Sequence, residues 1–447
     1  MYKNKESLIL ITLLIIITFS QIYNLNSNYG YGDDFAQYIM QSKSLFNNSL
    51  EEYELQSELN SFSESQIGPN SYPIGYPLLI KSIDIFFNGE FKYYKLINIL
   101  LFNIFIYLTF IIVSNKSKIY SLLVSVLIMT SKEVFILSNS IESDLFFAVI
   151  VLLSIYFFEK KRLNTALLIA LLGLLIKIQG IILVLLIIFT LRMTGNLKKI
   201  NKIIVLFPIL WVVIYFSQYS FLLGEYKDHI YQFSFLFSNF TYNLEILSVS
   251  FLPGNLEYKA TIFLFSILIS LILIKSAFSL HEYNIHTLLI IAYFSFFSLY
   301  LQQQGVRFLL IIIPSLFIVL FDIFKYKINN INISIIFVSI LIISNIFNYS
   351  KSDYSQKNLA FSPDNLELYT FIEGEVSDNE YVAFHKPRLL RLATNKKATY
   401  LEEATILKNP SFLVINKSDH DLYPASLLKK YILIDELNLY TIYKIEN

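Results

Sequence analysis

Apolar runs close to the length of a membrane-spanning helix recur along the whole chain, and they constrain its fold more than any other feature. A helix of about 20 apolar residues is long enough to cross a bilayer. Eleven runs are predicted as transmembrane helices, at about residues 7–23, 96–113, 119–137, 144–158, 164–176, 179–193, 203–223, 260–280, 287–303, 307–324 and 331–348. The runs at 164–176 and 179–193 could instead form one long span interrupted by Lys177 and Gln179, but the orientation described below requires two.

The composition agrees with an all-α polytopic membrane protein. Hydrophobic residues make up 55% of the 447 residues and charged residues only 15%, whereas a soluble domain has about 25% charge. A soluble protein could not bury so much apolar surface, which excludes a cytosolic enzyme, a secreted module and a disordered scaffold. A net charge of +1 gives no indication of nucleic-acid binding, and the absence of cysteine excludes disulfides and thiolate chemistry.

Lys and Arg residues in the short loops predict the orientation, because basic loops remain in the cytoplasm. They place the N-terminus inside and three more polar segments outside: residues 24–95, 224–259 and 349–447. No small-x-small cleavage site follows the first run, so we interpret it as an uncleaved span and not as a signal peptide. Richness in Ile, Asn, Lys, Phe and Tyr is typical of AT-biased coding in a bacterium. We expect a multi-pass protein of the bacterial inner membrane.

The C-terminal segment is predicted to form a small extracytoplasmic α/β domain. Ser362-Pro363-Asp364 is typical of a helix start. Short strand-like runs follow at residues 381–384, 412–415, 431–434 and 440–445. We therefore divide the chain into a transmembrane domain, residues 1–348, and the small domain, residues 349–447.

Two adjacent acids, Asp33 and Asp34, follow the first predicted span. Phe35, Tyr38 and Ile39 begin an apolar pattern at helical spacing, which predicts a helix in the membrane interface with the acids at its N-terminus. Helix capping explains one acid at such a position. Two neighbouring carboxylates repel each other, so a functional role for at least one of them is as well supported as capping.

A second segment of the same loop contains two prolines and a glycine, in Tyr72-Pro-Ile-Gly-Tyr-Pro77. It predicts a turn into another interfacial helix that ends near Phe87. Glu142 and Asp144 lie at the mouth of the fourth predicted span, on the same side as Asp33. Capping of that span by a neighbouring serine is the structural alternative.

Two cations lie on the same predicted side. Lys177, beside Gln179, interrupts an apolar stretch, where a cation must either reach the membrane surface or meet an anion. Arg307 begins the tenth predicted span, where it can anchor the helix or hold a phosphate through its planar fork of donors. Acids and cations that face a lipid interface suit a reaction on a phosphorylated lipid, with a carboxylate as general base.

These motifs resemble the GT-C superfamily of integral-membrane glycosyltransferases, in particular the protein O-mannosyltransferase and aminoarabinose-lipid A transferase types. Residues 32–38 (Gly-Asp-Asp-Phe-Ala-Gln-Tyr) resemble the acidic pair that follows the first helix of such proteins. Residues 72–77 resemble their proline-rich juxtamembrane segment, residues 142–144 their second acidic site, and residues 304–314 their late Arg-aromatic-Leu-Leu…Pro stretch. The resemblance covers about residues 7–324 in topology.

The resemblance implies a polyprenyl-phosphate or polyprenyl-diphosphate sugar donor, used on the outer face on a glycan, lipid or protein acceptor. Asp33 and Asp34 are then the predicted catalytic residues, with Asp33 as the base that activates the acceptor hydroxyl for attack with inversion. The predicted substrate-binding residues are Tyr38, Tyr72, Glu142, Asp144, Lys177, Gln179 and Arg307. Asp33 and Asp34 are also candidate ligands of a divalent metal ion, which some relatives use, although no residues here have the spacing of metal ligands.

The sequence departs from the family pattern at two places and leaves two other functions open. The second acid is Asp34 where relatives often have Glu, and Asn70 and Ser71 stand where some relatives have Lys. A transporter or flippase for lipid-linked glycans would place its polar residues within the spans, whereas the charges here gather at the outer ends. A polymerase or ligase of envelope polysaccharide would share the same site and donor.

Overall fold

The computed structural model describes residues 5–23, 25, 34–45, 72–87, 90–196, 198, 233–251, 266–267, 269–275, 284–299, 305–324, 327–328, 331–349, 359–402, 406–423 and 428–446. They group into two compact units. The first comprises Met1–Leu25 and Lys95–Tyr354, and the second Asn26–Tyr94 and Ser355–Asn447. The first outer loop therefore groups with the C-terminal segment, and not with the transmembrane residues as in our division at residue 348.

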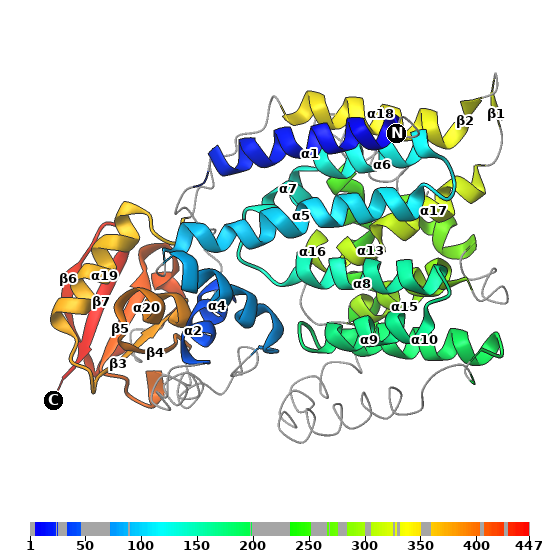
Figure 1. The fold of residues 1–447 in the computed structure, drawn as a ribbon. Coiled ribbons are helices and arrows are strands. Elements are labelled where there is room, and N and C mark those ends of the chain that lie inside the picture. Colours follow the sequence, from blue (N-terminus) through cyan, green and yellow to red (C-terminus); the bar gives the residue numbers. More distant parts are fainter. Residues whose placement is uncertain are drawn as a thin grey trace. The chain divides into compact units, whose positions relative to one another are not determined.

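The first unit is a bundle of apolar helices (Figure 1). Its elements are α1 (Lys5–Tyr23), α5 (Phe91–Val113), α6 (Lys118–Thr130), α7 (Lys132–Ser138), α8 (Asp144–Glu159), α9 (Leu163–Leu174), α10 (Gly180–Met193), α13 (Phe233–Phe251), α15 (Ile285–Ser298), α16 (Val306–Leu309), the 3-10 turn η3 (Leu310–Ile312), α17 (Ile313–Ile323), the strands β1 (Lys327–Ile328) and β2 (Ile331–Asn332), and α18 (Ile333–Tyr349). The first residues of α5 belong to the second unit, because the boundary falls after Tyr94.

Three described helices are long and apolar enough to cross a membrane: Lys5–Tyr23, Phe91–Val113 and Val306–Ile323. Only 11% of the apolar window of α1 is buried inside the protein, against 67% for α5, so the apolar side chains of α1 need a lipid environment. These helices agree with three of the predicted spans. The count of eleven stays a prediction, since the run at 203–223 and most of 260–280 lie outside the described residues.

The predicted span at 119–137 is wrong as a single helix. The chain bends by 72° between α6 and α7. Ser131 at the bend has an extended backbone (φ −69°, ψ 118°), and its hydroxyl donates to the backbone oxygen of Ser250, 2.8 Å away on α13. A contact with a distant helix thus ends α6 without any proline or glycine. The helix α13 itself was not predicted, because its sequence was assigned to an outer loop.

The run between residues 164 and 193 forms two helices and not one. α9 and α10 pack against each other across the turn that contains Lys177. A Cβ atom on Gly180 would lie 2.6 Å from the carbonyl carbon of Gly173 and 2.8 Å from the backbone nitrogen of Leu174. Only glycine permits this approach of the two backbones.

One buried histidine of the first unit shows how a polar side chain is accommodated in an apolar bundle, where it needs hydrogen-bond partners. The His286 ring lies between two partners, with Nδ1 at 2.9 Å from the Ser315 hydroxyl and Nε2 at 3.0 Å from a Glu159 carboxylate oxygen. Its exposed fraction is 4%. These contacts connect α15, α17 and α8.

In the part of the second unit that the structure describes, α-helices accompany a five-stranded mixed sheet (Figure 1). Its elements are α2 (Asp34–Ser44), α4 (Gly75–Phe87), α19 (Pro363–Glu375), β3 (Tyr381–Phe384), α20 (Pro387–Thr394), β4 (Lys397–Tyr400), β5 (Phe412–Asn416), the 3-10 helix η4 (Lys417–Leu422), β6 (Tyr431–Glu436) and β7 (Tyr440–Ile445). The strand order is β4-β3-β5-β7-β6, with β3 parallel to β4 and β5, and β7 antiparallel to β5 and β6.

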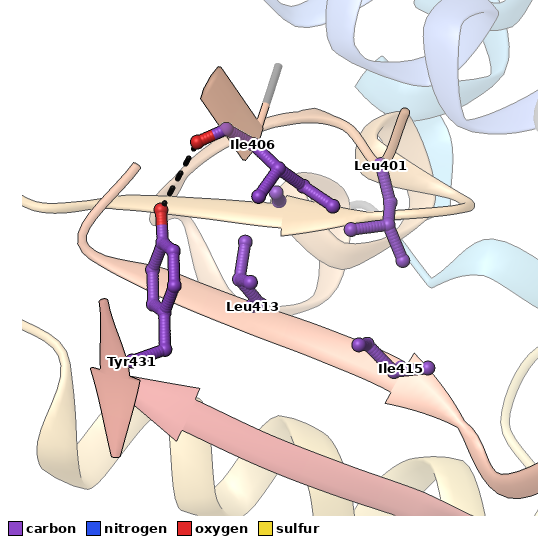
Figure 2. Close-up of a cluster of buried hydrophobic side chains, with 6 residues drawn as sticks. Leu401, Ile406, Leu413, Ile415 and Tyr431 are labelled. Carbon is purple, nitrogen blue, oxygen red and sulfur yellow. Dashed lines mark hydrogen bonds between the residues drawn. The ribbon is translucent and has the colours of Figure 1, made fainter. Parts of the chain in front are cut away.

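Buried apolar side chains on one face of the sheet form a core that includes Ala383, Leu401, Leu413, Ile415 and Tyr431 (Figure 2). The four predicted strands are confirmed, and so is the helix start, since the Ser362 hydroxyl accepts from the backbone nitrogen of Asn365. β4 and α20 were missed. β4 has only four residues and no alternating burial, and α20 has only eight residues, so neither element offers a run long enough for a pattern to stand out.

The predicted helices of the first outer loop are present as α2 and α4. α2 is not free to lie in a lipid interface along its whole apolar side, because it packs against α4 and α20. Phe35, Tyr38 and Ile39 are buried within the protein. On α4 the side chains of Ile85 and Phe86 are largely exposed, with exposed fractions of 72% and 78%, as expected of a helix that meets lipid.

A glycine pair tests the close approach of α9 and α10. Gly180→Ala is expected to lower the melting temperature of the purified protein, because the new Cβ meets backbone atoms that cannot rotate away; overpacking costs about 1–3 kcal/mol. Gly374→Ala on α19 is the control, since nothing lies within 4 Å of its new Cβ, and it should leave stability unchanged or raise it by up to about 1 kcal/mol. Equal melting temperatures for both variants would contradict the argument.

A histidine at the end of β3 makes stability depend on pH. Burial, with a smaller contribution from the charge of Lys386, lowers the pKa of His385 from 6.5 to about 4, while Asp419 opposes the shift. The folded protein holds this ring neutral, and the unfolded chain binds a proton below pH 6.5, so the stabilisation is present above pH 6.5 and is lost as the pH falls towards 4. The melting temperature, measured by circular dichroism, should fall less steeply from pH 6.5 to pH 4 in His385→Gln than in wild type. Parallel curves would contradict the assignment.

Candidate functional site

The predicted site residues that the structure describes fall into two clusters, one in each unit. We call the first the cation cluster; it comprises Glu142, Asp144, Lys177, Arg307 and Phe308. We call the second the acid–arginine cluster; it comprises Asp34, Tyr72 and Arg388. Asp33 lies outside the described residues.

The cation cluster is built on a buried ion pair. Asp144 begins α8, and Lys177 lies in the turn between α9 and α10. The Lys177 ammonium is 2.5 Å from an Asp144 carboxylate oxygen, and the side chains are 13% and 5% exposed. Ser143 at the N-cap of α8 makes no side-chain capping bond, and the Ser140 hydroxyl donates to the Leu137 carbonyl. Serine capping therefore does not account for this segment.

Arg307 completes the cluster from the next element. It is the second residue of α16, a helix that begins directly after Gly305, whose φ of +69° turns the chain into the helix. One guanidinium nitrogen of Arg307 is 3.7 Å from a Glu142 carboxylate oxygen. Asn98 on α5 donates to the Glu142 backbone oxygen at 2.9 Å and so fixes that loop.

Both cations lie over the ring of Phe308. The Lys177 nitrogen is 4.6 Å and the Arg307 guanidinium carbon 5.4 Å from the ring centroid. The negative face of an aromatic ring attracts cations, which lets two like charges approach the same point. Two cations and two carboxylates give this cluster a formal charge of zero. The Arg307 side chain nevertheless reaches the surface, since it is 23% exposed. An anion that reaches the cluster therefore finds a guanidinium with accessible donors.

Gln179 is placed by its backbone. It precedes the first residue of α10, and its carbonyl oxygen accepts from the Tyr293 hydroxyl at 3.0 Å. Its side chain is largely buried, with an exposed fraction of 8% for the residue. The described contacts thus assign it to the turn that presents Lys177, and its substrate-binding role stays a prediction.

The acid–arginine cluster joins three segments that are distant in sequence. Asp34 is the first residue of α2, and the Tyr72 hydroxyl donates to its carboxylate at 2.7 Å. Arg388 on α20 donates to the same Tyr72 oxygen at 3.2 Å and lies 3.8 Å from the Asp34 carboxylate. Burial raises the pKa of Tyr72 and the Asp34 charge raises it further, while Arg388 opposes the shift. Tyr72 is therefore a neutral phenol that donates to the carboxylate.

The tyrosine is held from both ends. The backbone nitrogen of Tyr72 donates to the Gln41 side-chain oxygen at 2.9 Å, and the Gln41 side-chain nitrogen donates to the Tyr72 carbonyl at 2.6 Å. The ring of Tyr38 packs on that of Tyr72 with centroids 4.6 Å apart. The structure thus brings together three predicted residues, Asp34, Tyr38 and Tyr72.

Arg388 was missed from the sequence, since every predicted site residue precedes the C-terminal segment. One signal could have found it: Arg388 and Arg391 are three residues apart in an otherwise apolar Pro-Arg-Leu-Leu-Arg-Leu stretch. Both are buried in the structure, each with an exposed fraction of 6%. Buried arginines are rare unless paired.

A divalent metal does not fit the described part of the acidic pair. The Asp34 carboxylate accepts from Tyr72 and faces the positive charge of Arg388, which repels a cation. Among the described residues, no group of three or more His, Cys, Asp or Glu side chains could hold a metal ion.

No family model matches the sequence, and no curated protein matches it. Solved structures do. ArnT from Cupriavidus metallidurans bound to undecaprenyl phosphate superposes with a TM-score of 0.58 over 98% of this chain and 97% of its own, at 9% identity. The apo state of the same protein gives a TM-score of 0.59 with the same coverage and identity.

This chain has the fold of ArnT. ArnT is an aminoarabinose-lipid A transferase of the GT-C type, so the resemblance stated from the sequence motifs is confirmed at the level of the fold. The likeness extends over nearly the whole of both chains and therefore includes the second unit as well as the helical bundle.

The buried ion pair yields a stability test that is independent of function. Asp144→Asn leaves the Lys177 charge without its carboxylate, and breaking a buried pair costs about 3–5 kcal/mol. The melting temperature in detergent should fall markedly, and the double variant Asp144→Leu/Lys177→Met should recover much of the loss. Asp322→Asn is the matched control, because its pair with Lys116 is more exposed, at 31% and 29%, and should contribute no more than about 1 kcal/mol. An Asp144→Asn melting temperature equal to that of the control would contradict the argument.

Proposed function

We propose that this chain is a membrane glycosyltransferase that transfers a sugar from a polyprenyl-phosphate-linked donor to an acceptor on the extracytoplasmic face. The observation that supports it best is the cation cluster within this fold. A lysine and an arginine converge on one ring in the same fold as ArnT, and one ArnT structure contains undecaprenyl phosphate.

In this proposal Arg307 binds the phosphate of the donor, and Lys177 supports it. Arg307 is the more exposed cation, and its 3.7 Å separation from Glu142 is a loose contact that a phosphate can replace. A planar guanidinium offers two parallel donors to phosphate oxygens. Lys177 remains paired with Asp144 at 2.5 Å, so it contributes positive potential more than direct contact. Both cations stabilise the negative charge that grows on the departing phosphate.

Asp33 acts as the general base, a role that rests on the sequence. It removes the proton of the acceptor hydroxyl while the acceptor oxygen attacks the anomeric carbon and forms the new glycosidic bond. The bond from that carbon to the phosphate oxygen breaks, and its electron pair leaves with the polyprenyl phosphate. Attack opposite to the leaving group inverts the anomeric centre. Asp34 is engaged with Tyr72 and Arg388, which leaves Asp33 as the better candidate for proton removal.

The experiment that tests the proposal is mass spectrometry of envelope glycans and lipid-linked sugars in cells that carry wild type, Asp33→Asn, Arg307→Gln or a deletion. One glycan should lose a sugar in all three mutants, while the matching polyprenyl-linked sugar accumulates. Asp33→Asn removes the general base, and a general base typically contributes about 10²–10⁴-fold to the rate. Arg307→Gln removes charge at the leaving group. The amount of protein in the membrane fraction is the control for expression.

Two outcomes contradict parts of the proposal. If Asp33→Asn behaves as wild type while the deletion traps an unchanged lipid-linked glycan on the inner face, the protein moves lipids and the acid pair is a helix cap. If the lost product is a long polymer and not a single sugar, the reaction is that of a polymerase or ligase.

A further inference from the structure

We propose that Arg388 is a positioning residue for sugar transfer: acting through Tyr72, it holds the Asp34 carboxylate and thereby orients the acidic pair. This inference rests on the proposed function, and it assigns to the C-terminal segment a part in the reaction. Arg388 touches no reacting atom in this account. It acts only through the groups to which it is bonded.

The direction of the hydrogen bonds supports an ordered chain of donors. The guanidinium can only donate, so the Tyr72 oxygen must accept from Arg388, at 3.2 Å. The hydrogen of that phenol is then directed to the Asp34 carboxylate, at 2.7 Å. A phenol that accepts from a cation becomes a stronger donor, because bonds in such a chain polarise one another. The carboxylate is therefore held in one orientation.

Residues of α2 fix the backbone and the ring of Tyr72, and Arg388 contacts its hydroxyl from a different segment. Gln41 fixes its backbone with two hydrogen bonds, and Tyr38 packs on its ring. Gln41 and Tyr38 belong to α2, the helix that Asp34 begins. Arg388 belongs to the C-terminal segment, beyond residue 355. Besides its hydrogen bond to the Tyr72 hydroxyl, its guanidinium carbon lies 5.6 Å from the centroid of the Tyr72 ring. Arg388 thus fastens the start of α2 to the sheet through α20.

The position of Asp34 links this contact to the chemistry. Asp34 is bonded directly to Asp33, and consecutive Cα atoms are about 3.8 Å apart. Any rotation of the first turn of α2 therefore displaces both acids. A misplacement of about 1 Å at a reacting group lowers the rate by about 10²-fold. Helix capping alone does not explain why two carboxylates stand side by side. The positive charge of Arg388 offsets the repulsion between them.

The test compares four variants of the full-length protein, purified in detergent: Arg388→Gln, Arg388→Lys, Tyr72→Phe and the double variant Tyr72→Phe/Arg388→Gln. The donor is the polyprenyl-linked sugar isolated from the cells that carry Asp33→Asn. Arg388→Gln and Tyr72→Phe should each lower kcat by about 10- to 100-fold with KM for the donor changed less than about 3-fold. Arg388→Lys keeps the charge and should recover part of kcat.

The double variant tests whether the two residues act in one chain. Its kcat should be no lower than that of the weaker single variant, since residues that act as a unit are not additive. Lys396→Gln is the matched control. It removes a cation from the same segment, at an exposed pair with Asp378 whose atoms are 2.7 Å apart, and it should retain wild-type kcat.

Two outcomes overturn the inference. One is a kcat of Arg388→Gln within twofold of wild type. The other is a parallel fall of kcat and melting temperature in all variants, because that pattern indicates a structural role alone. If Arg388→Gln does not fold, Arg388→Lys and Tyr72→Phe still test the inference, because the first keeps the positive charge and the second keeps the aromatic ring. Failure of the proposed function is distinct, because then wild type and Lys396→Gln transfer no sugar either.

Discussion

The cost of burying charge is the constraint on which the rest of this structure depends. A carboxylate lowers the cost of a lysine inside an apolar bundle, and Lys177, in the turn after α9, meets Asp144 at the start of α8. That pair requires the chain to turn sharply after α9, and the sharp turn requires glycine at position 180, where the backbones nearly touch. The catalytic proposal is thus built on a contact that the fold needs in any case.

The same constraint recurs in the second unit with different partners. A buried arginine on α20 is compensated by Asp34 and by the ring of Tyr72. In both clusters a cation lies over an aromatic ring while its carboxylate partner comes from another element. A ring neutralises no charge, so the cation keeps most of its attraction for an anion. This combination holds positive charge in place and leaves donors available to a phosphate at Arg307 and to a phenol at Arg388.

What the sequence could predict depends on how far apart the interacting residues are. Apolar runs predicted α1 and α5, and local turn chemistry predicted the start of α19, because both signals lie within a few residues. The bend at Ser131 could not be predicted, since its cause is a bond to Ser250. Arg388 escaped for the same reason: its partner Tyr72 is 316 residues away. No periodicity in one sequence reports such a contact.

The acid pair shows why adjacent residues of one type need different explanations. Asp34 is occupied by a phenol and faces a guanidinium, so its charge is already balanced. A general base must instead reach the proton of the acceptor hydroxyl, and a carboxylate that already accepts from a phenol has less access to that proton. In the proposed mechanism, Asp34 therefore holds the start of α2, while Asp33 removes the proton of the acceptor hydroxyl. Arg388, from a helix distant in sequence, supports this division, because its positive charge beside Asp34 offsets the repulsion between neighbouring carboxylates.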